Sequence, residues 1–234
     1  PYTSRAAALR DARRLSQAIS RQSAMADWPF GGGKCVVIGD PASQKSDALL
    51  LALGKATHQL GSSYLTADDS GTTVRDMEIM CNVTPHARGL ALASGEAGPA
   101  AAYGTFLALR VAVEHPLGRV GLTGMSVSVQ GLGNLGMRLC AYLHEAGAKL
   151  IVADPQTERL AMAVRDFGAR VVPVDRNLST LADVLSPNAF GDVICDATVP
   201  RIRAGIVVGG ANNQLRTARH GVALHNRGIL YVPD

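Results

Sequence analysis

The sequence predicts an α/β fold in two domains, built around a mostly parallel sheet with helices on both faces. Short β-branched segments alternate with segments of helical period along the 234 residues, which is typical of parallel sheets. The chain is 47% apolar, enough for a substantial core at this length. A loop-like stretch at 83–98, rich in glycine and with Pro85, separates two such patterns. We therefore expect one domain over residues 1–96 and a second over 97–234.

The first domain is predicted to contain three helices and two short strands. Alanine and leucine recur at helical spacing before Trp28-Pro29, where proline disfavours helical geometry in the preceding residue. Ser46 has the residue type of a helix N-cap. The expected helices are 5–26, 46–60 and 72–80, and the expected strands are 35–38, which should be buried, and 63–67.

The second domain begins with a nearly all-apolar segment, 99–113, which we interpret as a buried helix. Alternating strands and helices follow it. The expected strands are 126–129, 149–153 and 169–174, the expected helices are 131–146, 157–167 and one near 216–226, and shorter units are expected at 182–185, 205–208 and 228–232.

Composition excludes several classes of function. The net charge is only +4, arginines are scattered and aromatics make up 4%, whereas nucleic-acid-binding domains usually concentrate their charge. No apolar stretch reaches the length of a membrane-spanning helix. The four cysteines are far apart and form no C-x-x-C pair, so we expect reduced thiols in a cytoplasmic protein and no metal site.

A glycine motif in the second domain points to a dinucleotide. Gly131, Gly133 and Gly136 fit G-x-G-x-x-G, with Asn134 and Leu135 between the last two, and the motif lies between a predicted strand and a predicted helix. The first glycine permits a tight turn, the second lets the backbone approach a pyrophosphate, and the third lets helix and strand pack closely. This pattern predicts a Rossmann-type domain. The alternative is a glycine turn that packs such a unit without any ligand.

The next strand ends in Asp154, 23 residues after Gly131. An acid at this spacing hydrogen-bonds the ribose 2′-hydroxyl and repels a 2′-phosphate. The following residues, 155–157, include no arginine for a phosphate. The spacing therefore favours NAD over NADP as the cofactor.

The first domain carries Gly31-Gly32-Gly33-Lys34 before a predicted strand. Glycines let the backbone pass close to a small ligand, and a lysine at a pocket mouth loses hydration, so its pKa falls toward the range of a general base. The alternative is a solvated lysine after a flexible turn. One of the two carboxylates in the segment 66–72, Asp68 or Asp69, is a candidate for proton transfer, with a helix N-cap as the alternative.

Together these blocks resemble the family of glutamate, leucine, phenylalanine and valine dehydrogenases, most closely its leucine/valine/phenylalanine branch. The matching blocks run in order along the chain: G-G-G-K with V-V-I-G-D-P (31–41), T-A-D-D-S-G-T-T (66–73), G-P-A-A-A-Y-G (98–104), Q-G-L-G-N-L-G (130–136), L-H-E-A-G-A-K-L-I-V-A-D (143–154), G-A-N-N-Q-L (210–215), R-H-G (219–221) and the final G-I-L-Y-V-P-D.

The resemblance implies NAD-dependent, reversible oxidative deamination of an apolar L-amino acid to a 2-keto acid and ammonia, without a metal, by a homo-oligomer. It implies that Lys34 activates water and that Asp69 handles the amino nitrogen. It implies that Asn212, or its neighbour Asn213, holds substrate beside the nicotinamide, Asn212 also touching the cofactor. Gly31 and Gly32 would line the substrate site.

Two departures from the family pattern keep alternatives open. Gln22 stands twelve residues before Lys34, where family members carry a lysine that binds the substrate carboxylate, and Ala101 replaces a threonine that helps seat the nicotinamide. One alternative is the same chemistry on an amine or a specialised amino acid. The other is a catalytically silent homologue that binds NAD. Family members also extend further at both ends, so we expect the substrate domain to be incomplete in this sequence.

Overall fold

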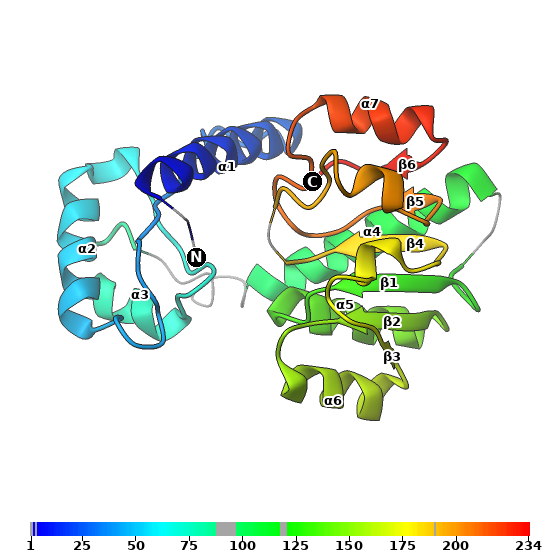
Figure 1. Ribbon diagram of the computed structural model, residues 1–234. Helices are drawn as coiled ribbons and strands as arrows, with labels where there is room; N and C mark the ends of the chain where they lie inside the picture. The colour runs from blue at the N-terminus through cyan, green and yellow to red at the C-terminus, as the bar shows by residue number, and fades with distance from the viewer. Residues whose placement is uncertain (1, 3, 88–96, 118–120, 190) are drawn as a thin grey trace. The chain divides into compact units, whose positions relative to one another are not determined.

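The computed structural model describes residues 2, 4–87, 97–117, 121–189 and 191–234. The chain separates into two compact units, Pro1–Ala97 and Gly98–Asp234. Each unit has its own helices, as the ribbon in Figure 1 shows. Each also has its own apolar clusters.

The described part of unit 1 contains three α-helices and a 3-10 turn, and the three predicted helices are confirmed. Local signals set their starts: the side chains of Ser4 and Ser46 accept hydrogen bonds from the first turns of two helices, and Thr73 and Asp76 form a capping box on the third. The elements are α1 (Arg5–Met25), α2 (Asp47–Gln59), η1 (Gly61–Ser63) and α3 (Val74–Cys81).

The two predicted strands of unit 1 are wrong in this structure. Residues 35–38 make no backbone ladder within the described chain, and Val37 and Ile38 are 48% and 59% exposed. In the segment 63–67, Ser63 is the last residue of η1, and Thr66 makes a single parallel bridge to Ala87. The physical reason is that a strand needs a neighbour for its N–H and C=O groups, and apolar alternation alone supplies none.

Unit 2 is a six-stranded parallel sheet, which confirms the predicted α/β class. The strands are β1 (Ser126–Gln130), β2 (Lys149–Ala153), β3 (Arg170–Val171), β4 (Val184–Pro187), β5 (Ile206–Val207) and β6 (Leu230–Tyr231). Their spatial order is β3-β2-β1-β4-β5-β6 and every pairing is parallel (Figure 1). This is the strand order of dinucleotide-binding Rossmann domains.

Helices cover both faces of this sheet, as the alternation predicts. Val127 and Val129 of β1 pack in the main cluster with residues of α4 (Ala97–Leu117), α5 (Asn134–Glu145) and α6 (Thr157–Phe167). On the other face, Leu185 of β4 and Val207 of β5 pack with Leu224 of α7 (Arg219–Asn226). Two 3-10 turns, η3 (Asn177–Ser179) and η4 (Val199–Arg201), complete the unit.

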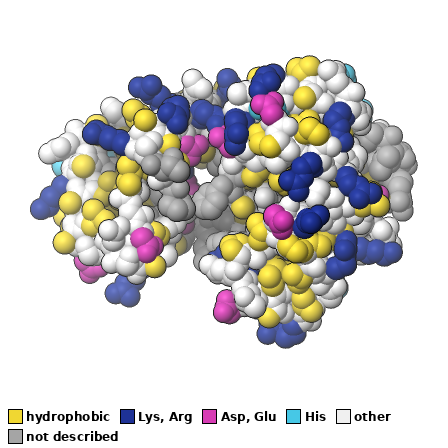
Figure 2. All heavy atoms as spheres, in the orientation of Figure 1, with side chains coloured by type: hydrophobic (Ala, Val, Ile, Leu, Met, Phe, Trp, Pro, Cys, Tyr) yellow, Lys and Arg dark blue, Asp and Glu magenta, His cyan; other side chains and the backbone are white. Residues whose placement is uncertain are grey.

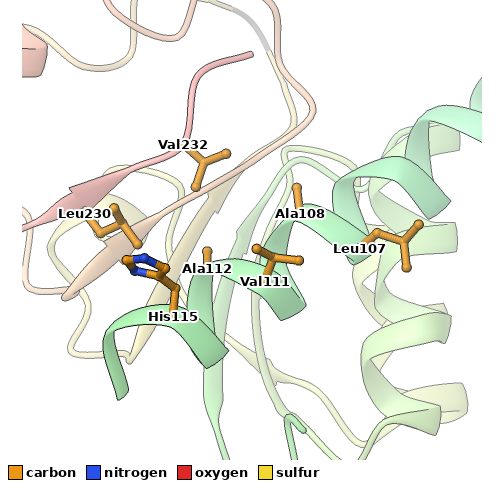
Figure 3. Close-up of a pocket in the computed structure, with 7 residues that line it drawn as sticks. All are labelled: Leu107, Ala108, Val111, Ala112, His115, Leu230 and Val232. Atoms are coloured by element: carbon orange, nitrogen blue, oxygen red, sulfur yellow. The ribbon is translucent and has the colours of Figure 1, made fainter. Parts of the chain in front are cut away.

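The expectation of a buried helix at 99–113 is only half right. One face of α4 lies in the main cluster, but Tyr103, Leu107 and Val111 are 50%, 39% and 62% exposed. These residues are four apart, so they form one stripe. Beside it, α4 and β6 enclose an apolar hollow of about 450 Å³. Figure 3 shows its lining: Leu107, Ala108, Val111, Ala112, His115, Leu230 and Val232. The sequence could not reveal this face, because apolar composition does not say which side a neighbour covers.

Surface and cysteine properties add little to the choice of function class. On the face shown in Figure 2, the Lys and Arg side chains lie at separate places over both units. Within the described residues, no helix is both long and apolar enough to cross a membrane. All four cysteines are free: Cys35 and Cys81 are exposed, and Cys140 and Cys195 are buried.

Candidate active site

Lys34 of unit 1 is mostly buried, with 19% of its side chain exposed. Its Nζ donates a hydrogen bond to Oδ2 of Asp69. Burial lowers the pKa of the Lys34 amine, while the nearby Asp11 carboxylate and Cys35 thiol act in the opposite direction. A lysine of lowered pKa accepts a proton more readily near neutral pH than a solvated lysine does. Lys34 is therefore not a solvated side chain after a flexible turn.

The glycines before Lys34 serve packing as well as space. A Cβ on Gly32 would lie 1.9 Å from the carbonyl oxygen of Ser16, so this residue must be glycine for the segment to lie against α1. The N–H of Gly32 donates to Oγ of Ser20 at 2.8 Å, and the hydroxyl of Ser16 donates to the Gly32 carbonyl. Gly31 has no atom within 4 Å of a built Cβ. Of the two predicted substrate-lining glycines, only Gly31 borders open space.

Asp69 lies in a tight turn that fixes its carboxylate. The Ser70 N–H donates to Oδ1 at 2.6 Å, and the Thr72 N–H donates to the Asp69 carbonyl at 2.8 Å. The other carboxylate oxygen holds Lys34. Thr73, not Asp69, is the N-cap of α3. The alternative in which Asp69 is only a helix cap is therefore wrong.

A hollow of about 410 Å³ lies beside Lys34 on unit 1. The rest of its lining comes from one face of α1: Leu9, Ala12, Arg13, Ser16 and Gln17. Gln22 is exposed and follows Ser20, which faces Gly32, by two residues. Residues two apart on a helix point in nearly opposite directions. The structure thus brings Arg13, not Gln22, to Lys34.

The glycine motif of unit 2 has the geometry of a nucleotide cradle. Gly131 has a φ of +88°, and a Cβ on Gly136 would lie 2.0 Å from the Gly131 carbonyl oxygen, so both glycines are needed for the turn and for helix packing. Gly133 is the N-cap of α5, where no side chain caps the helix, and a Cβ there would meet no atom within 4 Å. Open space beside uncapped N–H groups fits a pyrophosphate.

The other two motif residues differ in their surroundings. Asn134 begins α5 on the surface, and its Oδ1 accepts a hydrogen bond from Nε of Arg138 at 3.3 Å. Leu135 is half-buried against Gly210, where a Cβ would lie 2.5 Å from Cδ1 of Leu135. The start of α5 therefore packs on the loop that precedes Asn212.

Asp154 follows β2 and is buried. Its Oδ2 accepts a hydrogen bond from the N–H of Leu132, inside the glycine motif, at 2.7 Å, and its Oδ1 accepts one from the N–H of Gln156 at 2.8 Å. Nη1 of Arg159, in the first turn of α6, lies 4.0 Å from Oδ2. The segment 155–157 has no arginine that could bind a phosphate, but Arg159 stands just beyond it, five residues after Asp154.

The loop before Asn212 is tied to β4 by Asn188, for which no role was expected. Oδ1 of Asn188 accepts from the Gly210 N–H at 2.8 Å, and Nδ2 donates to the Ser186 carbonyl at 2.8 Å. The main-chain N–H of Asn188 donates to the carbonyl of Gln130, next to the glycine motif.

The two asparagines of this loop have different roles in the structure. Asn212 is exposed. Asn213 has a φ of +53°, and its N–H donates to the carboxylate of Asp234. Its Nδ2 is buried without a hydrogen-bond partner among the described residues. No group of three His, Cys, Asp or Glu side chains in the described chain could hold a metal ion.

Comparison with known proteins decides the family. A family model described as "Glu/Leu/Phe/Val dehydrogenase, dimerisation domain" matches residues 2–86. Leucine dehydrogenase from Geobacillus stearothermophilus is 41% identical over 236 residues, which covers 100% of this chain. The crystal structure of L-tryptophan dehydrogenase from Nostoc punctiforme is 36% identical with a TM-score of 0.74, over 100% of this chain and 67% of that one. The chain belongs to the Glu/Leu/Phe/Val dehydrogenase family.

Membership of the Glu/Leu/Phe/Val dehydrogenase family confirms the resemblance seen in the sequence blocks. The hetero-hexameric glutamate dehydrogenase from Thermus thermophilus shares the fold at 22% identity, with a TM-score of 0.76 over 96% of this chain and 61% of that one. The chain spans 64% of the length of the Geobacillus leucine dehydrogenase.

Proposed function

We propose that this protein catalyses the NAD-dependent, reversible oxidative deamination of an apolar L-amino acid to a 2-keto acid and ammonia. The observation that carries the proposal is the hydrogen bond from Lys34 Nζ to Asp69 Oδ2 beside a hollow. It joins a candidate base to a candidate acid, and unit 2 of the same chain has a dinucleotide-binding strand order. Relatives named leucine, tryptophan and phenylalanine dehydrogenase support an apolar side chain on the substrate.

When bound, NAD would supply the acceptor for the hydride that leaves the substrate Cα. Gly131, Gly133 and Gly136 shape the turn that would receive its pyrophosphate, and Asn134 and Leu135 begin the helix behind it. Asp154, after β2, is the candidate partner of the adenosine ribose, which supports NAD. Asn212, exposed on the loop after β5, is the candidate for holding substrate and nicotinamide, with Asn213 as the neighbour that shapes the loop.

Lys34 and Asp69 divide the proton chemistry. Loss of hydride from Cα leaves an imine, and water adds to its carbon while neutral Lys34 takes the water's proton at Nζ. That proton passes from Lys34 to Asp69, which delivers it to the nitrogen. Lys34, neutral again, then takes the proton of the carbinolamine hydroxyl as the C=O bond forms, the C–N bond breaks and ammonia leaves. Because Lys34 Nζ and Asp69 Oδ2 are hydrogen-bonded, the proton gained by one group has a direct path to the other.

We also propose that the protein is a homo-oligomer of the cytoplasm. Unit 1 exposes large apolar side chains, among them Met25 at 90%, Trp28 at 66% and Ile38 at 59%. Where exposed apolar side chains gather into one patch, the patch usually marks an interaction site. The family model for this unit is described as a dimerisation domain, and the four free thiols fit a reducing compartment. Light scattering that gives only the protomer mass would contradict the oligomer.

The decisive experiment is NADH formation at high pH with leucine, valine, isoleucine, phenylalanine, tryptophan, glutamate and two simple amines. We expect turnover of an apolar amino acid. Lys34→Ala should lower it at least about a hundredfold, the usual contribution of a general base. NAD binding by calorimetry should stay within a few-fold. Lys55→Ala, an exposed lysine of α2, is the matched control and should retain full activity.

Two outcomes would overturn this function. Turnover of amines alone would favour the same chemistry on a substrate without a carboxylate. NAD binding without turnover of any compound would favour a catalytically silent homologue. Full activity of Lys34→Ala would show that the base is another residue.

A further inference from the structure

Asp154 presents less negative charge to a ligand than its position suggests. Both carboxylate oxygens accept main-chain hydrogen bonds, one from Leu132 and one from Gln156, and only 4% of the side chain is exposed. Hydrogen bonds from N–H groups spread and partly neutralise the charge of a carboxylate. Asp154 thereby also fastens the glycine motif to the end of β2. It is a structural anchor as well as a candidate ribose partner.

Arg159 stands next to this carboxylate with most of its hydrogen-bonding capacity unused. Its Nη1 is 4.0 Å from Oδ2 of Asp154, too long for a hydrogen bond, and 40% of its side chain is exposed. A guanidinium has five N–H donors arranged for planar binding of carboxylate or phosphate. Among the described residues, this ion pair is the single interaction of the Arg159 side chain that the structure gives. The guanidinium therefore faces solvent beside the candidate ribose site.

In this fold, an acid after the second strand hydrogen-bonds the ribose hydroxyls of NAD, and an arginine nearby accommodates the 2′-phosphate of NADP. Here the two residue types stand side by side, and Arg159 balances the charge that would otherwise repel a phosphate. We propose that Arg159 is a specificity-determining residue that binds the 2′-phosphate, so that the protein accepts NADP as well as NAD. The proposal rests on the nucleotide site of the proposed function but not on its catalytic step.

The test is calorimetric titration of the whole protein with NAD, NADP, 5′-AMP and 2′,5′-ADP. The two smaller nucleotides isolate the adenosine end, so the readout needs no turnover. In the wild-type protein we expect dissociation constants for NAD and NADP within about tenfold of each other. Arg159→Leu should raise the dissociation constants for NADP and 2′,5′-ADP at least about tenfold, the effect of losing one charge-assisted hydrogen bond. The dissociation constant for NAD should change by less than about threefold.

Two further variants keep the test specific. Arg159→Lys retains the charge but not the planar donors, and should keep part of the NADP affinity. Arg165→Leu removes an arginine from the same helix, one that is 70% exposed and pairs with Asp166, and should leave both affinities unchanged. Equal weakening of NAD and NADP by Arg159→Leu would overturn the proposal, as would wild-type affinity for NADP a thousandfold below that for NAD.

Failure of this inference is distinguishable from failure of the proposed function. If the nucleotides bind with the expected pattern but no amine or amino acid is oxidised, the role of Arg159 is supported and the proposed dehydrogenase activity is wrong. If amino acids are oxidised with NAD and the Arg159→Leu variant binds NADP as the wild type does, the activity stands and Arg159 has no part in specificity.

Discussion

Oδ1 of Asn188 accepts a hydrogen bond from the main-chain N–H of Gly210 at 2.8 Å, and this bond joins the end of β4 to the loop that carries Asn212. The same side chain donates to the carbonyl and hydroxyl oxygens of Ser186. One half-buried amide thus uses both its donor and its acceptor to hold the loop.

Asn188→Ala should loosen this loop without removing any group that would touch substrate. It leaves the Gly210 N–H and the Ser186 carbonyl without their partner, so we expect the free energy of unfolding to fall by about 1–3 kcal/mol. In the active enzyme, KM for the amino acid should rise more than kcat falls. Thermal unfolding and steady-state kinetics measure the two effects. Asn226→Ala, an exposed asparagine in α7, is the control. No change in either quantity would show that the loop is held by its other bonds.

Two glycines of the nucleotide motif should respond differently to alanine. At Gly136 a Cβ would lie 2.0 Å from a backbone oxygen of Gly131, so Gly136→Ala should lower the free energy of unfolding by about 1–3 kcal/mol or more. At Gly133 a Cβ meets nothing within 4 Å, so Gly133→Ala should fold normally, within about 0.5 kcal/mol, yet weaken NAD binding at least tenfold. Chemical denaturation and calorimetry separate these effects. Unchanged NAD affinity in Gly133→Ala would place the pyrophosphate elsewhere.

Much of unit 2 follows from its sequence because its signals are local. Val127 and Val129 alternate with polar residues before Gly131, whose φ of +88° favours glycine, and that turn leads directly into α5. Strand, turn and helix are each decided within a few residues, and short parallel crossovers then set the strand order. The glycine-rich motif marks Lys34, the family resemblance marks Asp69, and the structure brings the two together across 35 residues of sequence.

Other features depend on contacts that local pattern does not specify. Val36 to Ile38 have the composition of a strand, but no described segment pairs with them. Arg159 reaches Asp154 only because α6 begins at Thr157, so that the first turn points back to the end of β2. Arg13 and Lys34 line the same hollow only because Gly32 packs on the face of α1 that carries Ser16. In each case the outcome depends on which way a helix face points or on whether a segment finds a strand to pair with.

The position of Arg13 predicts how the substrate carboxylate is bound. Arg13 lines the hollow beside Lys34, whereas Gln22 is exposed and two residues beyond the side of α1 that meets Gly32. Arg13→Gln should raise KM for the amino acid about tenfold or more through loss of a charge-assisted bond, and should leave KM for a simple amine unchanged. Gln22→Lys should change KM less than threefold, and Arg21→Gln is the matched control on α1. A large fall in KM for the amino acid on Gln22→Lys would instead show that the substrate carboxylate binds at position 22.

The lowered pKa of Lys34 predicts the pH dependence of deamination. The amine must be neutral to take a proton from water, so kcat/KM should be lost as the pH falls through the Lys34 pKa. Burial places that pKa below the ordinary lysine value of 10.5, and the acidic limb of the profile should lie below that pH.

Asp69→Asn removes an anion that favours protonated Lys34, so the acidic limb of the kcat/KM profile should move to lower pH. The maximal rate should also fall, because the path for the proton is lost. Asp175 is an exposed aspartate, and Asp175→Asn should leave the pH profile of kcat/KM unchanged. An Asp69→Asn limb at higher pH would contradict the assignment of the limb to Lys34, since losing a neighbouring negative charge cannot raise the pKa of an amine.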